Sequence, residues 1–423
     1  MTLISDITPR AEVGVTSYSA LTLHRSCPQK WSYNHLFGLE QPPVDDPAPA
    51  LRFGTWWHAL RAADAIERGR ALGSLKYAPL HIKCSDVFDV RVETRIHKDV
   101  PCDLEERKCH DWSHFDQVED LRDKVLRAAD DWNDRLPEYH VEKWVGYFGT
   151  ADVARMLKNL DLRWRTHHKE ELKHQHPIGV EVGWGRQLPG SETRLVGYTD
   201  EVQYDERRGM VVVVDHKTTK RLGTQSTADD LLDSQLDLNA WGLYERIEEW
   251  GVAQPSGIAF DRVLSAPPTK PKLTTRGARS KTVTNYDLLT YLAFCKSPEA
   301  IEAGYKPEQS EIDRISSPSY GSKWFQRPVR PVNRNLARVH LQAAVDTALD
   351  AQATILRVQK RGEAPRNFTG AACDWCSFAK LCRAQMIGGP LGEYEVTEYG
   401  LQVKGPKASK NPPRQTVLAE VSG

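Results

Sequence analysis

The stretch "VVVVDHKTTK", Val211 to Lys220, decides the fold. Four consecutive valines are typical of a strand that is covered on both faces of a sheet. Because side chains alternate along a strand, Asp215 and Lys217 leave it on the same face. A buried strand therefore ends by presenting an acid and a base from one side. From this pattern alone, the more ordinary interpretation is a strand that surfaces and carries a solvated ion pair, since D-x-K is a short motif.

The overall composition excludes little but directs attention to local features. Lys and Arg together number 57, as do Asp and Glu, so any surface for nucleic acid must be local. There is no run of 18 apolar residues, and the N-terminus lacks a basic region followed by an apolar stretch. We therefore expect no membrane association and a cytoplasmic location. In a reducing compartment the eight cysteines indicate metal binding more readily than disulfides.

Hydrophobic periodicity and turn residues predict a mixed α/β core. The first three expected strands form an antiparallel meander that feeds a helix and then a further strand. The expected strands are residues 178–188, 193–204, 210–217 and 256–264. The expected helices are residues 17–38, capped by Ser17 or Ser19 and ended by Gly38, and residues 52–69, 141–174, 231–250 and 336–361.

Changes in composition along the chain suggest how it is divided. We expect an N-terminal helical segment (1–60), a helical or irregular insertion (61–140), a central core (141–261), a basic insertion or loop (262–335), a C-terminal helix with a cysteine-rich segment (336–390) and a tail (391–423). From Gln402 on, the tail is polar and rich in Pro and Lys, so we expect it to be disordered.

The expected loop after the last core strand contains basic residues and no acid between Arg262 and Lys281. Its basic side chains are candidates for contacts with nucleic-acid phosphates. The residues in question are Lys270, Lys272, Arg276, Arg279 and Lys281. The alternative is a solvated, flexible loop. Trp31, Trp56 and Trp57 are candidates for stacking on single-stranded bases, although packing inside the N-terminal region is the favoured interpretation.

Two carboxylates lie near the ends of neighbouring strands, Asp200 in "LVGYTDEVQY" and Asp215 in "VVVVDHKTTK". A hairpin would bring them together, and two partly buried acids repel each other unless a cation lies between them or one stays protonated. Carboxylate oxygens suit Mg²⁺ or Mn²⁺. A lysine beside such an ion can orient the attacking water and stabilise charge on a phosphate. This set of groups is suited to metal-assisted phosphodiester hydrolysis.

The same two strands resemble the core of the PD-(D/E)XK nuclease superfamily, in its RecB-like branch, where a G-x-x-D strand is followed by D-x-K-T. Three further stretches match that branch in order: "YSALTLHRSCPQKWSYNHLFGLE" with its Cys-Pro-x-x-Trp signature, "FGTWWHAL" with G-T-x-x-H-x-x-L, and "SQLDLNAWGL" beside Q-L-x-x-Y. The resemblance covers residues 16–60, 178–260 and 366–385. It implies a restriction-endonuclease-like core, a mixed central sheet flanked by helices, with helical insertions.

The resemblance also implies a set of site residues. His58, Asp200 and Asp215 would be metal ligands, together with the main-chain carbonyl of His216, and Lys217 would position the water or stabilise charge. Without the resemblance, a lone histidine such as His58 is more often a packed core residue.

The resemblance also bears on other positions in and near the matched motifs. Gln235 would contact Lys217 or the scissile phosphate. Asn239 stands where the family usually has tyrosine, and Trp241 or Tyr244 is the candidate substitute for that ring. Glu181, on the preceding strand, is expected to be structural or to support the ligands rather than to bind metal directly.

Three cysteines form C-x₂-C-x₅-C, Cys373, Cys376 and Cys382, and the local sequence offers no fourth ligand. In iron–sulfur members of the RecB-like branch, one cysteine before the core and three after it hold a [4Fe–4S] cluster, and Cys27 matches the first of these. Such a cluster would join the two ends of the domain. The alternatives are a Cys₄ zinc site or free buried thiols.

Four cysteines remain outside this set, Cys84, Cys102, Cys109 and Cys295. Cys102 and Cys109 lie near two histidines, His110 and His114, but the spacing fits no zinc pattern. We therefore expect these four to be buried or surface thiols.

Taken together, these features predict a metal-dependent DNA exonuclease of the iron–sulfur, RecB-like type. It would act on single-stranded DNA ends in recombination, repair or DNA processing, in a phage or a bacterium. The chain has no Walker A motif, so a helicase or recombination partner would supply any motor. The alternatives are a non-catalytic DNA-binding or assembly subunit that keeps the scaffold, and a structure-specific endonuclease.

Overall fold

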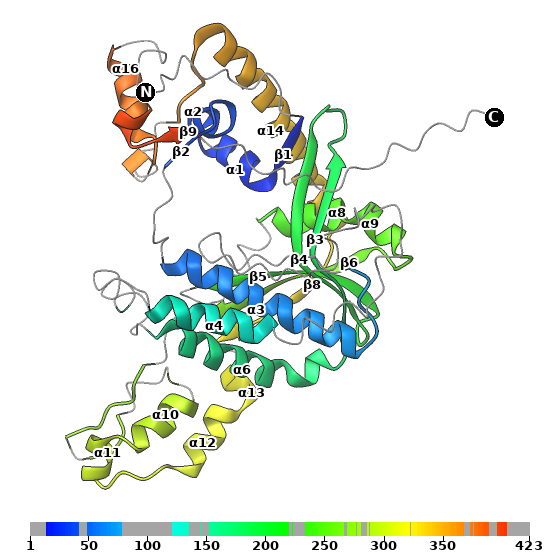
Figure 1. Cartoon of the computed structure of the whole chain (residues 1–423). Coiled ribbons are helices and arrows are strands. Elements are labelled where there is room, and N and C mark those ends of the chain that lie inside the picture. The colour runs from blue at the N-terminus through cyan, green and yellow to red at the C-terminus, as the bar shows by residue number, and fades with distance from the viewer. Residues whose placement is uncertain are drawn as a thin grey trace, which may run out of the picture.

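A computed structural model of the chain shows a central sheet between helical layers, with two further helical regions beyond it (Figure 1). It describes residues 14–41, 49–77, 121–134, 145, 152–219, 222, 233–265, 269–275, 277–280, 286, 288–321, 323–367, 373–374, 376–388 and 396–403. The described helices include none that combines the length and apolar character of a membrane span.

The central sheet is built on the predicted meander. β3 (Gln175–Gln187), β4 (Arg194–Asp205) and β5 (Met210–Thr219) pair antiparallel in order, and β6 (Pro255–Leu264) lies parallel to β5. β1 (Val15–Ser17) adds parallel to β4, while β7 (Phe325–Gln326) and β8 (Val329–Pro331) add antiparallel to β6. The mixed α/β prediction and its strand order are therefore confirmed.

The valines of β5 are buried on both faces, as predicted. Each of the four from Val211 to Val214 is at most 1% exposed. Val211 and Val213 belong to the apolar core beneath α8 (Gln235–Gly242) and α14 (Arg334–Arg361). Val212 and Val214 pack with Ala259 on the other face. Burial on both sides fixes the register and direction of the strand, so its end holds a defined position.

Helices cover the two faces of the sheet with separate apolar cores. One layer consists of α3 (Pro49–Ala71), α4 (Leu121–Asp134) and α6 (Val153–Leu172). The other layer consists of α1 (Tyr18–Ser26), α8 and α14. A short helix, α9 (Tyr244–Glu249), comes directly after α8 in the sequence. Trp31, Trp56 and Trp57 are each at most 1% exposed, so they are core residues and have no free ring face for a base.

The predicted N-terminal helix is interrupted. Ser17 caps α1, as predicted, by accepting a hydrogen bond from the Ala20 N–H, and Gly38 has a positive φ of 65°. Between these two residues the helix is interrupted at Cys27, whose backbone is extended. α2 (Pro28–Trp31) and a π-helical turn, η2 (Ser32–Leu36), follow it. The single-helix prediction was wrong because Pro28 disfavours helical backbone at the residue before it.

The two ends of the described chain meet in one region. β2 (Leu39–Glu40) pairs antiparallel with β9 (Gln402–Val403), just after the 3₁₀ turn η7 (Thr397–Tyr399). The end of α14 and α16 (Ala379–Gly388) pack on the same apolar core as η2 (Figure 1). Gln402 and Val403 were expected in a disordered tail and instead form a strand. The rest of that tail, residues 404–423, lies outside the described residues.

Residues 262–335 are not simply a loop. They contain α10 (Leu288–Cys295), α11 (Pro298–Glu302), α12 (Gln309–Ser316) and α13 (Pro318–Gly321), drawn below the sheet in Figure 1. A small core of aromatic and aliphatic side chains holds them together, Tyr286, Tyr291, Phe294, Ile315 and Tyr320 among them. The loop alternative was wrong, and the insertion alternative stays a prediction. Pro and Ser indicated a loop but here start two of the helices, since Ser297 caps α11 at Pro298 and α13 begins at Pro318.

The predicted helices next to the core begin later than expected. α6 starts at Val153 instead of residue 141, and α8 starts at Gln235 instead of residue 231. Residues 223–232 and most of 135–151 lie outside the described residues.

A substitution of Gly242, at the end of α8, tests how closely this helix packs on the sheet. A Cβ at Gly242 would overlap the ring of Trp184, which also lies against Gly197. We expect Gly242→Ala to lower the free energy of unfolding by about 1–3 kcal/mol, because overpacking outweighs the helix-propensity gain of about 1 kcal/mol. Gly14→Ala is the control, since open space surrounds Gly14. Thermal unfolding midpoints measure both, and a more stable Gly242→Ala protein would contradict this packing.

Candidate metal centre and its surroundings

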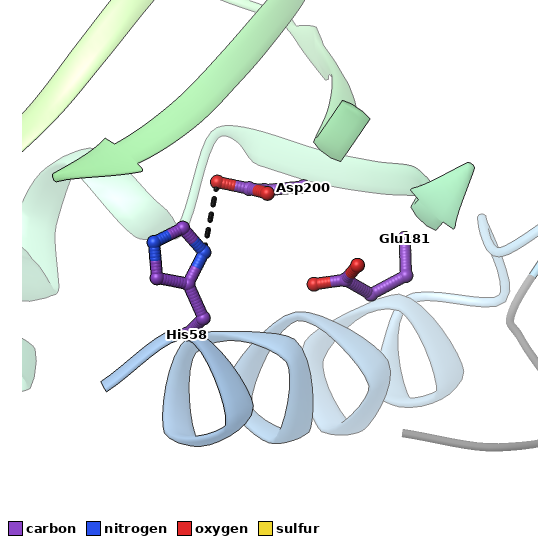
Figure 2. A group of neighbouring side chains, drawn as sticks. All are labelled: His58, Glu181 and Asp200. Atoms are coloured by element: carbon purple, nitrogen blue, oxygen red, sulfur yellow. Dashed lines mark ion pairs between the residues drawn. The ribbon is translucent and has the colours of Figure 1, made fainter. Parts of the chain in front are cut away.

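Three side chains from three elements converge beside the sheet. His58 comes from α3, Glu181 from β3 and Asp200 from β4 (Figure 2). One ligand atom of each lies within 4.8 Å of the others, and His58 Nδ1 is 3.2 Å from Asp200 Oδ2. In the part of the chain that the structure describes, this is the only group of three or more His, Cys, Asp or Glu residues that meets that distance.

α3 passes close to the end of β5 one turn before His58. A Cβ at Gly54 would lie 3.4 Å from Thr218 Oγ1 of β5, so the helix approaches the end of that strand closely. Trp56 and Trp57 bury the same turn in the core. The His58 side chain itself remains 32% exposed and faces Asp200. It is therefore not the packed core histidine that the pattern alone would favour.

Glu181 reaches the group through an unusual backbone conformation. Its φ is 48°, and among the described residues it is the only non-glycine with a positive φ. Glu181 lies opposite Asp200, between the register pairs Val180–Glu201 and Val182–Thr199. A glutamate gains nothing locally from this conformation, and such residues concentrate at functional sites. The structure thus groups Glu181 with His58 and Asp200, where the sequence had suggested a supporting position.

The charges of the group favour a cation. Burial raises the pKa of Glu181 to about 8, and the neighbouring Asp200 carboxylate adds to the rise. Burial also acts to raise the pKa of Asp200, but His58 and His216 outweigh it and lower that pKa to about 2. Without added positive charge only one of the two carboxyls is readily ionised. Two carboxylates and an imidazole form a donor set that fits Mg²⁺ or Mn²⁺.

Asp215 and Lys217 lie beside this group, on the same face of β5. Lys217 Nζ is 2.6 Å from Asp215 Oδ2, and Gln235 at the start of α8 donates from Nε2 to Asp215 Oδ1 at 2.8 Å. Lys217 Nζ also donates to Gln235 Oε1 at 3.3 Å. Burial raises the pKa of Asp215 to about 6, and Asp200 adds to the rise. Asp215 therefore neighbours Asp200 electrostatically, although it is not part of the compact group of three.

His216 lies between Asp215 and Lys217 and points to the other face of β5. Its main-chain N–H donates to Asp200 Oδ2 at 2.7 Å. Its ring is buried, with Nδ1 2.9 Å from Asp261 Oδ2 and Nε2 3.6 Å from Glu201 Oε2. Burial lowers the pKa of His216, but these two carboxylates outweigh it and raise that pKa to about 9. Neither Asp261 nor Glu201 was predicted as part of this region, although Asp261 directly follows the buried strand residue Phe260.

Trp241 and Tyr244, the candidate substitutes for the tyrosine that the family usually has, lie beside Arg186. Asn239 is buried in α8. The rings of Trp241 and Tyr244 lie 4.7 and 5.4 Å from the guanidinium carbon of Arg186 on β3. The ring that the structure places near Lys217 is Phe260, with its centroid 5.9 Å from Lys217 Nζ.

The basic residues of the insertion have different surroundings. Arg279 lies 3.3 Å from Glu311 and donates to the Tyr286 hydroxyl, so its side chain helps to hold the small helical core together. Lys270 is exposed and lies 3.5 Å from Glu299. Lys272 is exposed, and Arg276 and Lys281 lie outside the described residues.

The four cysteines of the expected cluster are free thiols brought to one region. Cys27, Cys373, Cys376 and Cys382 are all partly buried. The Ser26 carbonyl accepts from Asn367 Nδ2 at 2.9 Å, and the Gln29 N–H donates to the Pro365 carbonyl at 2.9 Å, so the first cysteine lies beside the C-terminal segment.

These thiols do not form a compact group. Burial raises the pKa of the Cys382 thiol, Arg366 lowers it, and Cys27 and Cys376 raise it further, which reflects their proximity. No three of the described thiols lie within 4.8 Å of one another. Cys295 is buried in the core of the insertion, and Cys84, Cys102 and Cys109 lie outside the described residues.

The candidate metal site can be tested without a substrate. We expect Mn²⁺ to raise the thermal unfolding midpoint of the native chain and to have little effect on that of Asp200→Asn or His58→Ala. The first variant loses a carboxylate ligand and the second an imidazole ligand. Glu206→Gln is the matched control, since Glu206 Oε2 lies 3.1 Å from His174 Nδ1 in a similar pair on the surface. Equal Mn²⁺ stabilisation of the Asp200→Asn protein and the native chain would place the ion elsewhere.

Comparison with known proteins agrees with this geometry. A search of curated proteins found no match. The family profile of the PD-(D/E)XK nuclease superfamily matches residues 15–383, which is most of the 423-residue chain and includes every element of the site. The chain belongs to the PD-(D/E)XK nuclease superfamily.

Proposed function

We propose that this nuclease is a Mg²⁺- or Mn²⁺-dependent DNA exonuclease of the RecB-like, iron–sulfur type, acting on single-stranded ends. The observation that carries the hydrolytic part is the convergence of His58, Glu181 and Asp200 beside the Asp215–Lys217 pair. Family membership supplies the reaction class and implies a DNA substrate. The single-strand preference, the end requirement and the cluster rest on the sequence motifs.

Some residues of the site would bind the metal ion, and others would act on the water or the phosphate. His58, Glu181 and Asp200 would hold one divalent ion, and Asp215 and the main-chain carbonyl of His216 would complete its ligands. The ion would supply positive charge to the scissile phosphate and lower the pKa of a bound water.

Lys217 is the group that acts on the water or on the phosphate. Burial lowers the pKa of Lys217, but Asp215 outweighs it and raises that pKa, so the side chain is a cation that stabilises developing negative charge. Gln235 holds both partners, because its amide accepts from Lys217 and donates to Asp215. We infer that Gln235 keeps Lys217 directed at the scissile phosphate, and that Lys217 orients the attacking water by hydrogen bonding.

The iron–sulfur part of the proposal rests on the cysteine motifs, and the position of Cys27 beside the C-terminal segment is compatible with it. A single zinc ion would hold its thiolates about 3.8 Å apart. In the sequence, however, Cys27 and the C-x₂-C-x₅-C set match the iron–sulfur arrangement, whose iron and sulfide atoms would lie between the four ligands. The cluster would then link the start of α2 to α16 and the segment before it, and stabilise that region.

Lys217 and Asp215 test the hydrolytic mechanism. We expect Lys217→Ala and Asp215→Asn to lower kcat by about 10²–10⁴-fold, because each removes charge stabilisation or water positioning in the transition state. Lys173→Ala is the control, since Lys173 is exposed and paired with Glu170 on the surface. The assay uses end-labelled DNA, single- and double-stranded, linear and circular, with Mg²⁺ or Mn²⁺.

The same assay separates the remaining alternatives. Degradation of linear but not circular single strands is expected of the exonuclease. Cleavage of circles would favour the endonuclease alternative. Full activity of the Lys217→Ala protein would refute the mechanism, and binding without hydrolysis by the native chain would favour the non-catalytic subunit.

The cluster is tested by colour and metal content. Protein purified without oxygen should be brown, with absorbance at about 400 nm, because thiolate-bound iron–sulfur clusters absorb there. Cys382→Ser should lose this absorbance and Cys295→Ser should keep it, since Cys295 lies in a different core. Colourless protein with one equivalent of zinc would instead establish the Cys₄ zinc site.

A further inference from the structure

An exposed aromatic ring lies next to the metal centre on the same strand. Tyr198 precedes Asp200 by two residues on β4 and is 53% exposed. Its neighbours Gly197 and Thr199 face the opposite side, where the Trp184 ring lies against Gly197. Tyr198 and Asp200 therefore share the outer face of the β3–β4 hairpin.

Tyr198 has a flat backbone surface beneath it. Gly183 is its register partner on β3, and a Cβ at Gly183 would lie only 3.2 Å from Tyr198 Cε1. The ring thus rests across a strand that carries no side chain at this point, and about half of the residue remains exposed to solvent. Glu181 precedes Gly183 by two residues on β3, so the ring lies one strand repeat away from two of the proposed metal ligands, Glu181 on β3 and Asp200 on β4.

We propose that Tyr198 is a stacking platform for the nucleobase next to the scissile phosphate. This inference rests on the proposed function and adds to it a contact with the base. A buried tyrosine would be explained by packing, but an exposed ring beside reacting groups has a free π-face. Any base can stack on such a face, so the contact fixes the strand without reading its sequence. The occupant is an unpaired base, because a paired base keeps its faces within the duplex.

The test measures binding separately from hydrolysis. Oligonucleotide affinity is measured by fluorescence anisotropy in EDTA, with single-stranded DNA that is intact or has one abasic position, moved stepwise along the strand. We expect one abasic position to weaken binding by the native chain about tenfold. Tyr198→Ala should bind the intact strand about tenfold more weakly and should be insensitive to that abasic position. Tyr198→Phe should behave like the native chain.

Tyr204→Ala provides the matched control, because Tyr204 is 40% exposed on the same strand but packs beside His176, away from the metal centre. Native-like binding of the intact strand by Tyr198→Ala, or an unchanged abasic effect in that variant, would overturn the inference. A parallel hydrolysis assay in Mg²⁺ separates the two claims. Tyr198-dependent binding without hydrolysis would refute only the proposed function, and hydrolysis with Tyr198-independent binding would refute only the platform.

Discussion

Burial of β5 on both faces is the constraint on which the site depends. The valines from 211 to 214 leave the strand no freedom to shift by one residue, because a one-residue shift would exchange its two faces. Asp215 and Lys217 therefore stay directed at α8, where Gln235 holds both of them. His216 is forced to the opposite face, into the protein interior. A single buried strand thus fixes three polar side chains in alternating directions.

On the buried side of the end of β5, neighbouring carboxylates offset the cost of burying His216. A buried histidine would be costly without partners, and His216 has Asp261 on one side and Glu201 on the other. Glu201 in turn lies 3.1 Å from Arg68 of α3, and Asp261 accepts from the Trp164 indole of α6. Such networks contribute little net stability, since desolvation offsets their attraction. Here the network ties two helices of one covering layer, α3 and α6, to the strand end that carries the site.

The motifs predicted more of the site than of the surrounding structure. Asp215 and Lys217 were predicted from strand alternation and Asp200 from the end of a neighbouring strand, whereas His58 and Gln235 were predicted only from the resemblance to the nuclease superfamily. Glu181 was underestimated because its position depends on a φ of 48°, which no local pattern indicates. Tyr198 was missed for the opposite reason, since an exposed tyrosine becomes informative only when its neighbours are known. The helices of residues 288–321 were missed because their core forms from residues far apart in that segment, such as Tyr286 and Ile315.

The central claim is that His58, Glu181 and Asp200 together bind one divalent ion beside Lys217. Crystals of the native chain grown with Mn²⁺ and measured at the manganese absorption edge test it most directly. The account predicts one anomalous peak in contact with His58, Glu181 and Asp200 and near Asp215. A peak held by other residues alone, or none at a Mn²⁺ concentration that supports hydrolysis, would contradict it.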